Sequence, residues 1–234
     1  MKQRIMIALL TYGDSVNVSF LSWLDQLAVL NSDPAHPRTY EVAYVPGRRP
    51  VAYARNVAMA RFLKSGADKL WFIDDDLVPT ESSLRIFESD ADIISGLYYL
   101  LFVEEGSRPS ILSCIYYKKS GGFSNIDAKT RLIGQSIIPI DAAGTGSLVI
   151  DRRVFMDSRM MLPLEYEMAD GGIDRHSDAD SVPYFRTLYK ADASEERSED
   201  LDFVWRAKQL GYRCECVLDA RFYHKKEVMI DWFI

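Results

Sequence analysis

One stretch decides how this chain is interpreted: DKLWFIDDDLVP, residues 68–79. Its apolar middle is typical of a buried strand, and three consecutive carboxylates follow it at once, at Asp74, Asp75 and Asp76. Adjacent carboxylates repel one another, so folding alone gives little reason for them. A divalent cation supplies a reason, because Mg²⁺ and Mn²⁺ bind oxygen ligands and open α/β sheets bind ligands at the carboxyl ends of their strands. The alternative is a solvated acidic turn, with Thr80 as the cap of a following helix.

The size and charge of the chain limit its possible classes. Its 234 residues suit one domain with a substantial core. With 28 basic and 34 acidic residues the net charge is −6, which does not indicate a nucleic acid or an anionic membrane as partner. Three cysteines, at 114, 214 and 216, do not make a disulfide framework and indicate a reducing compartment. Since no apolar run reaches the length of a membrane span, we expect a cytoplasmic protein.

Strand-like and helix-like segments alternate through the first hundred residues. The expected strands are residues 4–11, 40–45, 69–73 and 92–99, and the expected helices are residues 18–30, 50–66 and 80–88. This alternation predicts an α/β fold with a mixed, mostly parallel, Rossmann-like sheet flanked by helices.

The second half of the chain has a different character. Its expected strands are residues 110–118, 136–140, 147–150 and 212–217, and a helix is expected from Ser198 to about Leu210, ended by Gly211. Residues 165–197 are polar and acidic with weak periodicity, which is typical either of an active-site lid or of a disordered surface insertion. No linker divides the chain, so residues 1–234 are expected to form a single domain.

Two acidic groups and one histidine are candidates for a common site. Asp74 and Asp76 are alternate residues and share a face of the strand, whereas Asp75 points elsewhere. Glu199 and Asp200 fall in the first turn of a helix, where acids also stabilise the helix dipole; beside a metal, Asp200 can take a proton from an acceptor hydroxyl. His224 is either a structural histidine or a third metal ligand.

Two further features allow close approach to a ligand. Gly144, Thr145 and Gly146 are small residues before a strand, so their backbone can contact a ligand or form a tight turn. Arg55 lies in a helix after the second strand, where it can reach a diphosphate or remain a surface charge.

In their order and spacing these pieces resemble the GT-A glycosyltransferases, particularly the family 2-like group. Each match is short and unspecific alone, but together they span nearly the whole chain. The matching residues are Leu10-Thr11-Tyr12, Ala54-Arg55-Asn56-Val57-Ala58, Phe72-Ile73-Asp74-Asp75-Asp76, Ile94-Ser95-Gly96, Gly144-Thr145-Gly146, Ser198-Glu199-Asp200-Leu201-Asp202-Phe203, Gly211-Tyr212 and His224.

The resemblance implies a transferase that uses a nucleotide-sugar donor held against Mn²⁺ or Mg²⁺, with UDP weakly favoured over GDP. Residues 1–100 would be the nucleotide-binding half, and residues 101–234 the acceptor-side half. The implied metal ligands are Asp74, Asp76 and His224; the implied base of an inverting transfer is Asp200, with Glu199 beside it; and the implied contacts to the donor are Thr11, Tyr12, Arg55, Asp74, Asp75, Gly144, Thr145 and Gly146.

One departure from the family pattern leaves the nucleobase open. Many members place an acid at the end of the second strand to bind the base, whereas here that strand continues as Val45-Pro46-Gly47. Retaining enzymes share the DxD pair and the late histidine, so the stereochemistry is open as well. Two other hypotheses are a sugar nucleotidyltransferase, for which residues 11–15 lack a basic residue, and a catalytically silent nucleotide-sugar-binding module.

The acceptor is not indicated by the sequence. A glycan, a lipid-linked sugar, a protein, a small molecule or a hydroxylated DNA base can each offer a hydroxyl. Arg48-Arg49 and Lys225-Lys226 are basic pairs suited to phosphate contacts, but the net charge of −6 disfavours nucleic acid.

Overall fold

The computed structural model describes most of the chain. It covers residues 2–11, 18–46, 51–102, 110–120, 122–126, 135–162, 165–167, 173–175, 183–186 and 198–225. Tyr12, the Arg48-Arg49 pair and Lys226 lie outside these ranges, as does most of the segment 165–197. What was predicted for them therefore stays a prediction.

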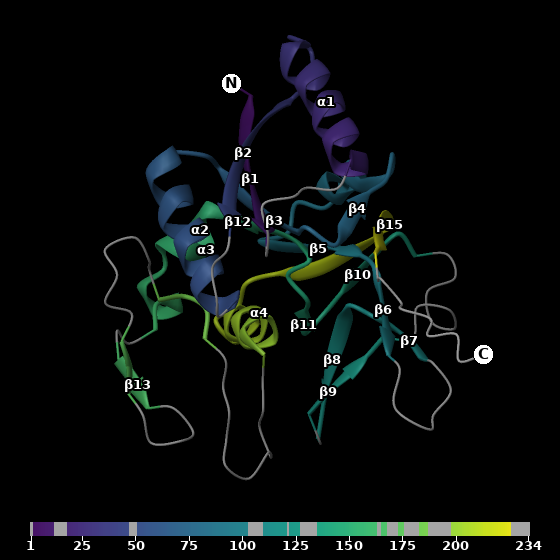
Figure 1. The fold of residues 1–234 in the computed structure, drawn as a ribbon. Helices are drawn as coiled ribbons and strands as arrows, with labels where there is room; N and C mark the ends of the chain where they lie inside the picture. The colour runs from purple at the N-terminus through teal and green to yellow at the C-terminus, as the bar shows by residue number, and fades with distance from the viewer. Residues whose placement is uncertain are drawn as a thin grey trace, which may run out of the picture.

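A large central sheet organises the fold (Figure 1). It has eight strands in the order β10-β15-β5-β12-β3-β1-β2, with β4 paired to β15. The strands are β1 (Gln3–Thr11), β2 (Arg38–Pro46), β3 (Lys69–Asp74), β4 (Leu77–Pro79), β5 (Ile93–Leu97), β10 (Ile137–Pro139), β12 (Ser147–Asp151) and β15 (Cys214–His224). β1, β2 and β3 are parallel to one another, as are β5 and β15, whereas β12 runs antiparallel between β3 and β5. The predicted mixed, mostly parallel α/β sheet is confirmed.

Two consecutive aromatic residues of β3 show how the helices cover both faces. Trp71 packs on one face against Trp23 of α1 (Val18–Ser32), with ring centroids 5.4 Å apart, and against Phe87 of the 3₁₀ helix η1 (Ser83–Glu88). Phe72 packs on the other face against Phe185, which stacks on Phe203 of α4 (Glu199–Gln209). α2 (Val51–Ser65) and α3 (Arg152–Met156) join this second layer through an edge contact between their phenylalanines. Because both faces are covered, β3 is apolar from Leu70 to Ile73, between the charged residues at its two ends.

Short strands form smaller sheets beside the central one. They are the pair β6 (Tyr99–Phe102) and β7 (Ser110–Ser113), the three strands β8 (Ile115–Lys119), β9 (Gly122–Asn125) and β11 (Ala142–Ala143), and the pair β13 (Glu165–Glu167) and β14 (Ile173–Arg175). A 3₁₀ turn, η2 (Ser158–Met160), follows α3. None of the described helices has the length and hydrophobicity that crossing a membrane requires.

Four elements differ from the sequence expectation. The strands expected at 92–99 and 110–118 are each broken, at Tyr98 and at Cys114, where the Cys114 N–H donates to the Tyr98 carbonyl at 3.1 Å. In place of the helix expected at 80–88, a turn follows the short strand β4, and the 3₁₀ helix η1 begins only at Ser83. The late strand continues past Val217 to His224, because its pairing shifts there and its end pairs with β4.

Candidate active site

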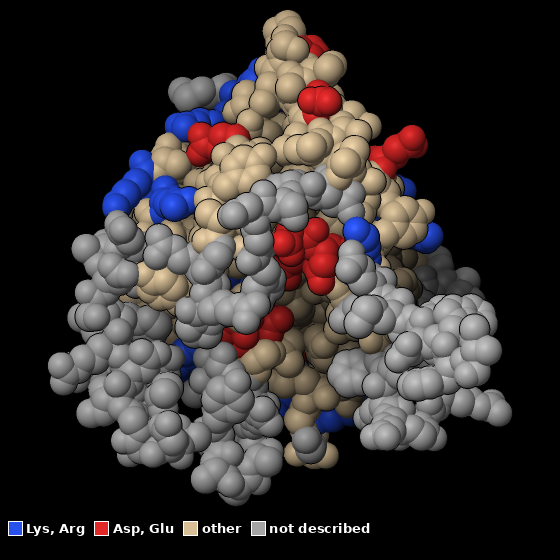
Figure 2. Space-filling model, viewed as in Figure 1, with Lys and Arg blue, Asp and Glu red and all other residues tan. Residues whose placement is uncertain are grey.

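A pocket of about 230 Å³ lies at the carboxyl end of β3. Its walls are Leu10, Thr11, Val45, Val51, Ala54, Arg55, Asp74, Asp75 and Asp76. Figure 2 shows acidic side chains gathered in a hollow near the centre of this face. The structure thus brings together five of the residues expected to contact the donor or metal, from three separate segments, and adds an apolar side built by β1, β2 and α2.

Asp74 and Asp76 have different partners. β3 ends at Asp74, and a turn carries the chain through Asp75 and Asp76 into β4. Strand alternation therefore no longer sets the direction of the third aspartate. Asp74 faces Arg55, with Oδ2 and Nη2 3.7 Å apart, whereas Asp76 faces His224.

His224 is fixed at the site by its backbone and by both ring nitrogens. The pairing of β15 with β4 places it opposite Leu77, one residue after Asp76. Nδ1 lies 3.2 Å from the Tyr99 carbonyl, which can only accept, so Nδ1 carries the proton of this hydrogen bond. Nε2 lies 2.8 Å from Oδ2 of Asp76. A backbone carbonyl behind a histidine is the usual way of directing the other nitrogen towards a metal.

This pair fits a divalent cation that takes further ligands from a substrate. Among the described residues, no group of three or more His, Cys, Asp or Glu side chains is placed to hold a metal. Asp76 and His224 offer two ligands, an oxygen and a nitrogen, and Mg²⁺ or Mn²⁺ bound to a nucleotide commonly has few protein ligands besides phosphates and water. The ligand role predicted for Asp74 stays a prediction.

Arg55 connects the end of β3 with the start of α4. Its side chain is 4% exposed and forms ion pairs with Asp74 and with Glu199, which is itself 8% exposed. Burial raises the pKa of Asp74 to about 6; Arg55 lowers it, and the neighbouring carboxylates raise it. Arg55 thus faces two carboxylates, Asp74 and Glu199, and its one positive charge cannot neutralise both.

Asp200, unlike Glu199, is only partly buried. Its Oδ1 accepts hydrogen bonds from the Ser198 hydroxyl and from the Leu201 N–H at 2.8 Å. Its Oδ2 lies 3.6 Å from the point that a Cβ on Gly144 would occupy. Of the two acids predicted to be catalytic, Asp200 is the more exposed.

Tyr98 explains the glycines at 144 and 146. A Cβ on Gly144 would overlap the Tyr98 hydroxyl, and one on Gly146 would lie 2.7 Å from it. The Gly146 N–H donates to that hydroxyl at 3.2 Å, and the hydroxyl of Thr145 is buried without a hydrogen-bond partner among the described residues. The glycine loop predicted to face a ligand is therefore packed against a tyrosine, at a place next to Asp200.

Sequence reasoning missed Tyr98 and Tyr99. The ring of Tyr98 makes an edge contact with His224 at a centroid distance of 6.0 Å, and the Tyr99 carbonyl orients the same histidine. Their positions follow from the break between β5 and β6, which no local pattern indicates. The small residues at 144 and 146 were the available signal, since they imply that something approaches the backbone closely.

Comparison with known proteins supports the fold. No protein-family model and no curated protein matches the chain. Among solved structures, A197 from STIV is similar with a TM-score of 0.56 at 18% identity, over 96% of this chain and 87% of that one. HddC from Yersinia pseudotuberculosis complexed with GMP-PN is more distant, with a TM-score of 0.38 at 13% identity over 92% of each chain. The similarity to A197 shows a shared fold and leaves the activity to be argued from the site.

Proposed function

We propose that this protein is a metal-dependent glycosyltransferase that moves a sugar from a nucleotide-sugar donor to a hydroxyl acceptor. One observation carries the proposal: Asp76 and His224 face each other at 2.8 Å on the edge of an acid-lined pocket, with the histidine oriented by a backbone carbonyl. Two ligands of this kind suit a cation shared with a diphosphate.

The pocket has one apolar and one charged side, as a nucleoside diphosphate requires. Leu10, Val45, Val51 and Ala54 offer contacts to a base and ribose, with the Thr11 hydroxyl beside them. At the charged side, the cation, when bound, offsets the negative charge that develops on the departing diphosphate. Arg55 adds a guanidinium at the same wall.

Asp200 is proposed as the general base. It accepts the proton of the acceptor hydroxyl, whose oxygen forms a bond to the anomeric carbon as the bond from that carbon to the diphosphate oxygen breaks. Attack from the side opposite the leaving group inverts the anomeric carbon. Glu199 is unsuited to this step because it is buried against Arg55.

Donor turnover with Mn²⁺ tests the proposal. A thermal-shift screen of UDP- and GDP-sugars, with and without Mn²⁺, first identifies the donor. Release of nucleoside diphosphate is then measured for the wild type, for Asp76→Ala, and for Asp219→Asn as a control at a partly exposed carboxylate paired with Arg85. We expect the Asp76 variant to lose turnover by about 100-fold or more and the control to match the wild type.

Other outcomes identify the competing hypotheses. Tight donor binding without turnover on any acceptor would favour a silent binding module. A product with the anomeric configuration of the donor would show a retaining enzyme. If no nucleotide sugar binds with or without Mn²⁺, the proposed function is wrong.

A further inference from the structure

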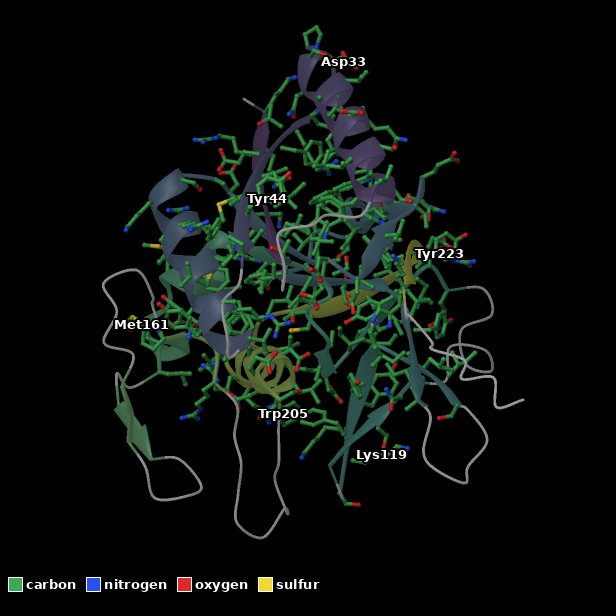
Figure 3. All side chains as sticks on the ribbon, in the orientation of Figure 1. Asp33, Tyr44, Lys119, Met161, Trp205 and Tyr223 are labelled. Carbon is green, nitrogen blue, oxygen red and sulfur yellow. The ribbon has the colours of Figure 1, made fainter. Side chains whose placement is uncertain are left out.

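Arg55 joins two segments that are far apart in the sequence. From α2 it contacts Asp74 at the end of β3 and Glu199 at the start of α4. Both Arg55 and Glu199 are buried, and a buried charge is stable only when it is paired. The pair therefore fixes the first turn of α4, the helix just above the Trp205 label in Figure 3, relative to the carboxyl end of β3.

Consecutive helix residues point in different directions, about 100° apart. In α4 this turns Glu199 towards Arg55 and leaves Asp200 partly exposed beside Gly144. The Ser198 hydroxyl and the Leu201 N–H hold one oxygen of Asp200, but both belong to the same turn of chain. Those contacts set the direction of the carboxylate within the turn, whereas the pair with Arg55 sets where the turn itself lies.

Arg55 also has a hydrogen-bond donor left for a ligand. Its Nε is buried and lacks a partner among the described residues, although the residue lines the pocket. An unpaired buried N–H is costly, and a ligand with anionic oxygens would satisfy it. The same side chain thus contacts the donor pocket and holds the helix that bears the candidate base.

We infer that Glu199 is a positioning residue, which acts through Arg55 to place Asp200 opposite the end of β3. This inference rests on the proposed function for the role of Asp200, but the ion pair between Arg55 and Glu199 is a property of the fold. It differs from the sequence expectation, in which Glu199 was catalytic alongside Asp200.

A charge-removing substitution with a matched control tests the inference. Glu199→Gln keeps the shape of the side chain and removes its charge. Asp92→Asn does the same to a comparably buried carboxylate paired with Arg153, at the opposite, amino end of β5. For both variants, turnover of the donor is measured with water or the identified acceptor, and hydrogen exchange is measured for the first turn of α4, where the Asp202 N–H donates to the Ser198 carbonyl at 3.0 Å.

We expect Glu199→Gln to lower kcat by about 10–100-fold, because the base is misplaced, and to leave donor affinity within about threefold. In the same variant, exchange at the first turn of α4 should be about tenfold faster, and Asp92→Asn should change neither quantity at this site. Unchanged exchange at α4, or a kcat equal to that of the wild type, would overturn the inference.

The two hypotheses fail in different ways. If the wild type has no turnover, the proposed function is wrong, and the exchange measurement alone decides whether Glu199 holds α4. If the wild type turns over and Glu199→Gln behaves like Asp92→Asn, the function stands and Glu199 is an ordinary structural acid.

Discussion

Acidic residues at the two ends of the central sheet differ in how many cationic or hydrogen-bonding partners they have. At the amino end three acids have partners of their own: Asp151 pairs with Lys69 at 3.0 Å, Asp68 accepts from the Arg4 N–H, and Asp92 pairs with Arg153. At the carboxyl end, Asp74, Asp75 and Asp76 line a pocket whose lining residues include one cation, Arg55. Arg55 also pairs with Glu199 at the start of α4.

The difference separates carboxylates that each have their own partner from carboxylates that share one guanidinium, and we propose that the second group binds a ligand. A paired buried carboxylate gains from its hydrogen bonds and charge, so the amino end adds stability. Burial raises the pKa of Asp74 to about 6, and repulsion by the neighbouring carboxylates adds to the effect, so its ionised form is disfavoured. Such a cluster adds little to the stability of the fold. This is the physical reason for the proposal that the carboxyl end binds a cation and an anionic substrate.

The largest effect should come from the candidate base. Asp200→Asn removes the proton acceptor and should lower donor turnover by about 1,000-fold, with donor and Mn²⁺ binding unchanged. Steady-state kinetics together with a binding titration separate the two quantities. Turnover within tenfold of the wild type would mean that another group accepts the proton.

The glycine loop tests how closely the carboxyl end is packed. Gly144→Ala would place a methyl group against the Tyr98 hydroxyl, with the ring carbon Cζ next at 3.5 Å, and should lower the free energy of unfolding by about 1–3 kcal/mol. Adding Tyr98→Phe removes the clashing oxygen and should recover part of that loss.

Gly146→Ala is the matched comparison for that rescue. Its Cβ would also meet Cζ of Tyr98 at 2.8 Å and Cδ1 of Leu77 at 2.9 Å, so Tyr98→Phe should not restore stability. Denaturant unfolding of the four variants checks both statements. If Tyr98→Phe restored the stability of both alanine variants equally, the packing of Tyr98 described for the two glycines would be contradicted.

At the amino end, removing a carboxylate should destabilise the protein. Asp92 accepts from the Arg153 side chain and from the Arg213 N–H at 2.9 Å. Asp92→Asn should therefore lower the free energy of unfolding by about 1.5–3 kcal/mol, as measured by denaturant unfolding at neutral pH. If the variant were as stable as the wild type, the claim that acids at the amino end stabilise the fold would be wrong.

At the carboxyl end, removing the charge of Asp74 should stabilise the metal-free protein. The pKa of Asp74 is raised from 3.8 to about 6 in the folded state, so the folded state holds this proton more tightly than the unfolded state does. Stability is consequently lost as pH rises between those values. Asp74→Asn, which mimics the protonated form, should add about 1–2 kcal/mol at pH 7.5 and nothing near pH 3.5. Unfolding curves of both proteins at the two pH values, with a chelator present, show whether the substitution raises or lowers the free energy of unfolding.

Local sequence patterns predicted what depends on local physics. β3 was predictable because burial on both faces leaves a continuous apolar run, and α4 because Gly211, with φ of 93°, ends it. The three adjacent aspartates could be singled out because neighbouring carboxylates repel one another, and in the structure they line the pocket.

Long-range contacts could not be predicted from the sequence. The alternation argument placed Asp74 and Asp76 together, but β3 ends at Asp74 and the two acids have separate partners, Arg55 and His224. The tie from Arg55 to Glu199 and the approach of Tyr98 to Gly144 join residues far apart in the chain, and only the assembled sheet brings them into contact.

The central claim is that Asp76 and His224 hold a divalent cation. Mn²⁺ binding, followed by electron paramagnetic resonance of the free ion in the presence of UDP, measures this directly in the wild type, Asp76→Asn and His224→Ala. His36→Ala is the control, since that histidine contacts Tyr40 at the amino end of β2. We predict that each site variant weakens Mn²⁺ binding by about 10–100-fold and that the control does not. Equal Mn²⁺ affinity in all four proteins would contradict the assignment of the cation to this pair.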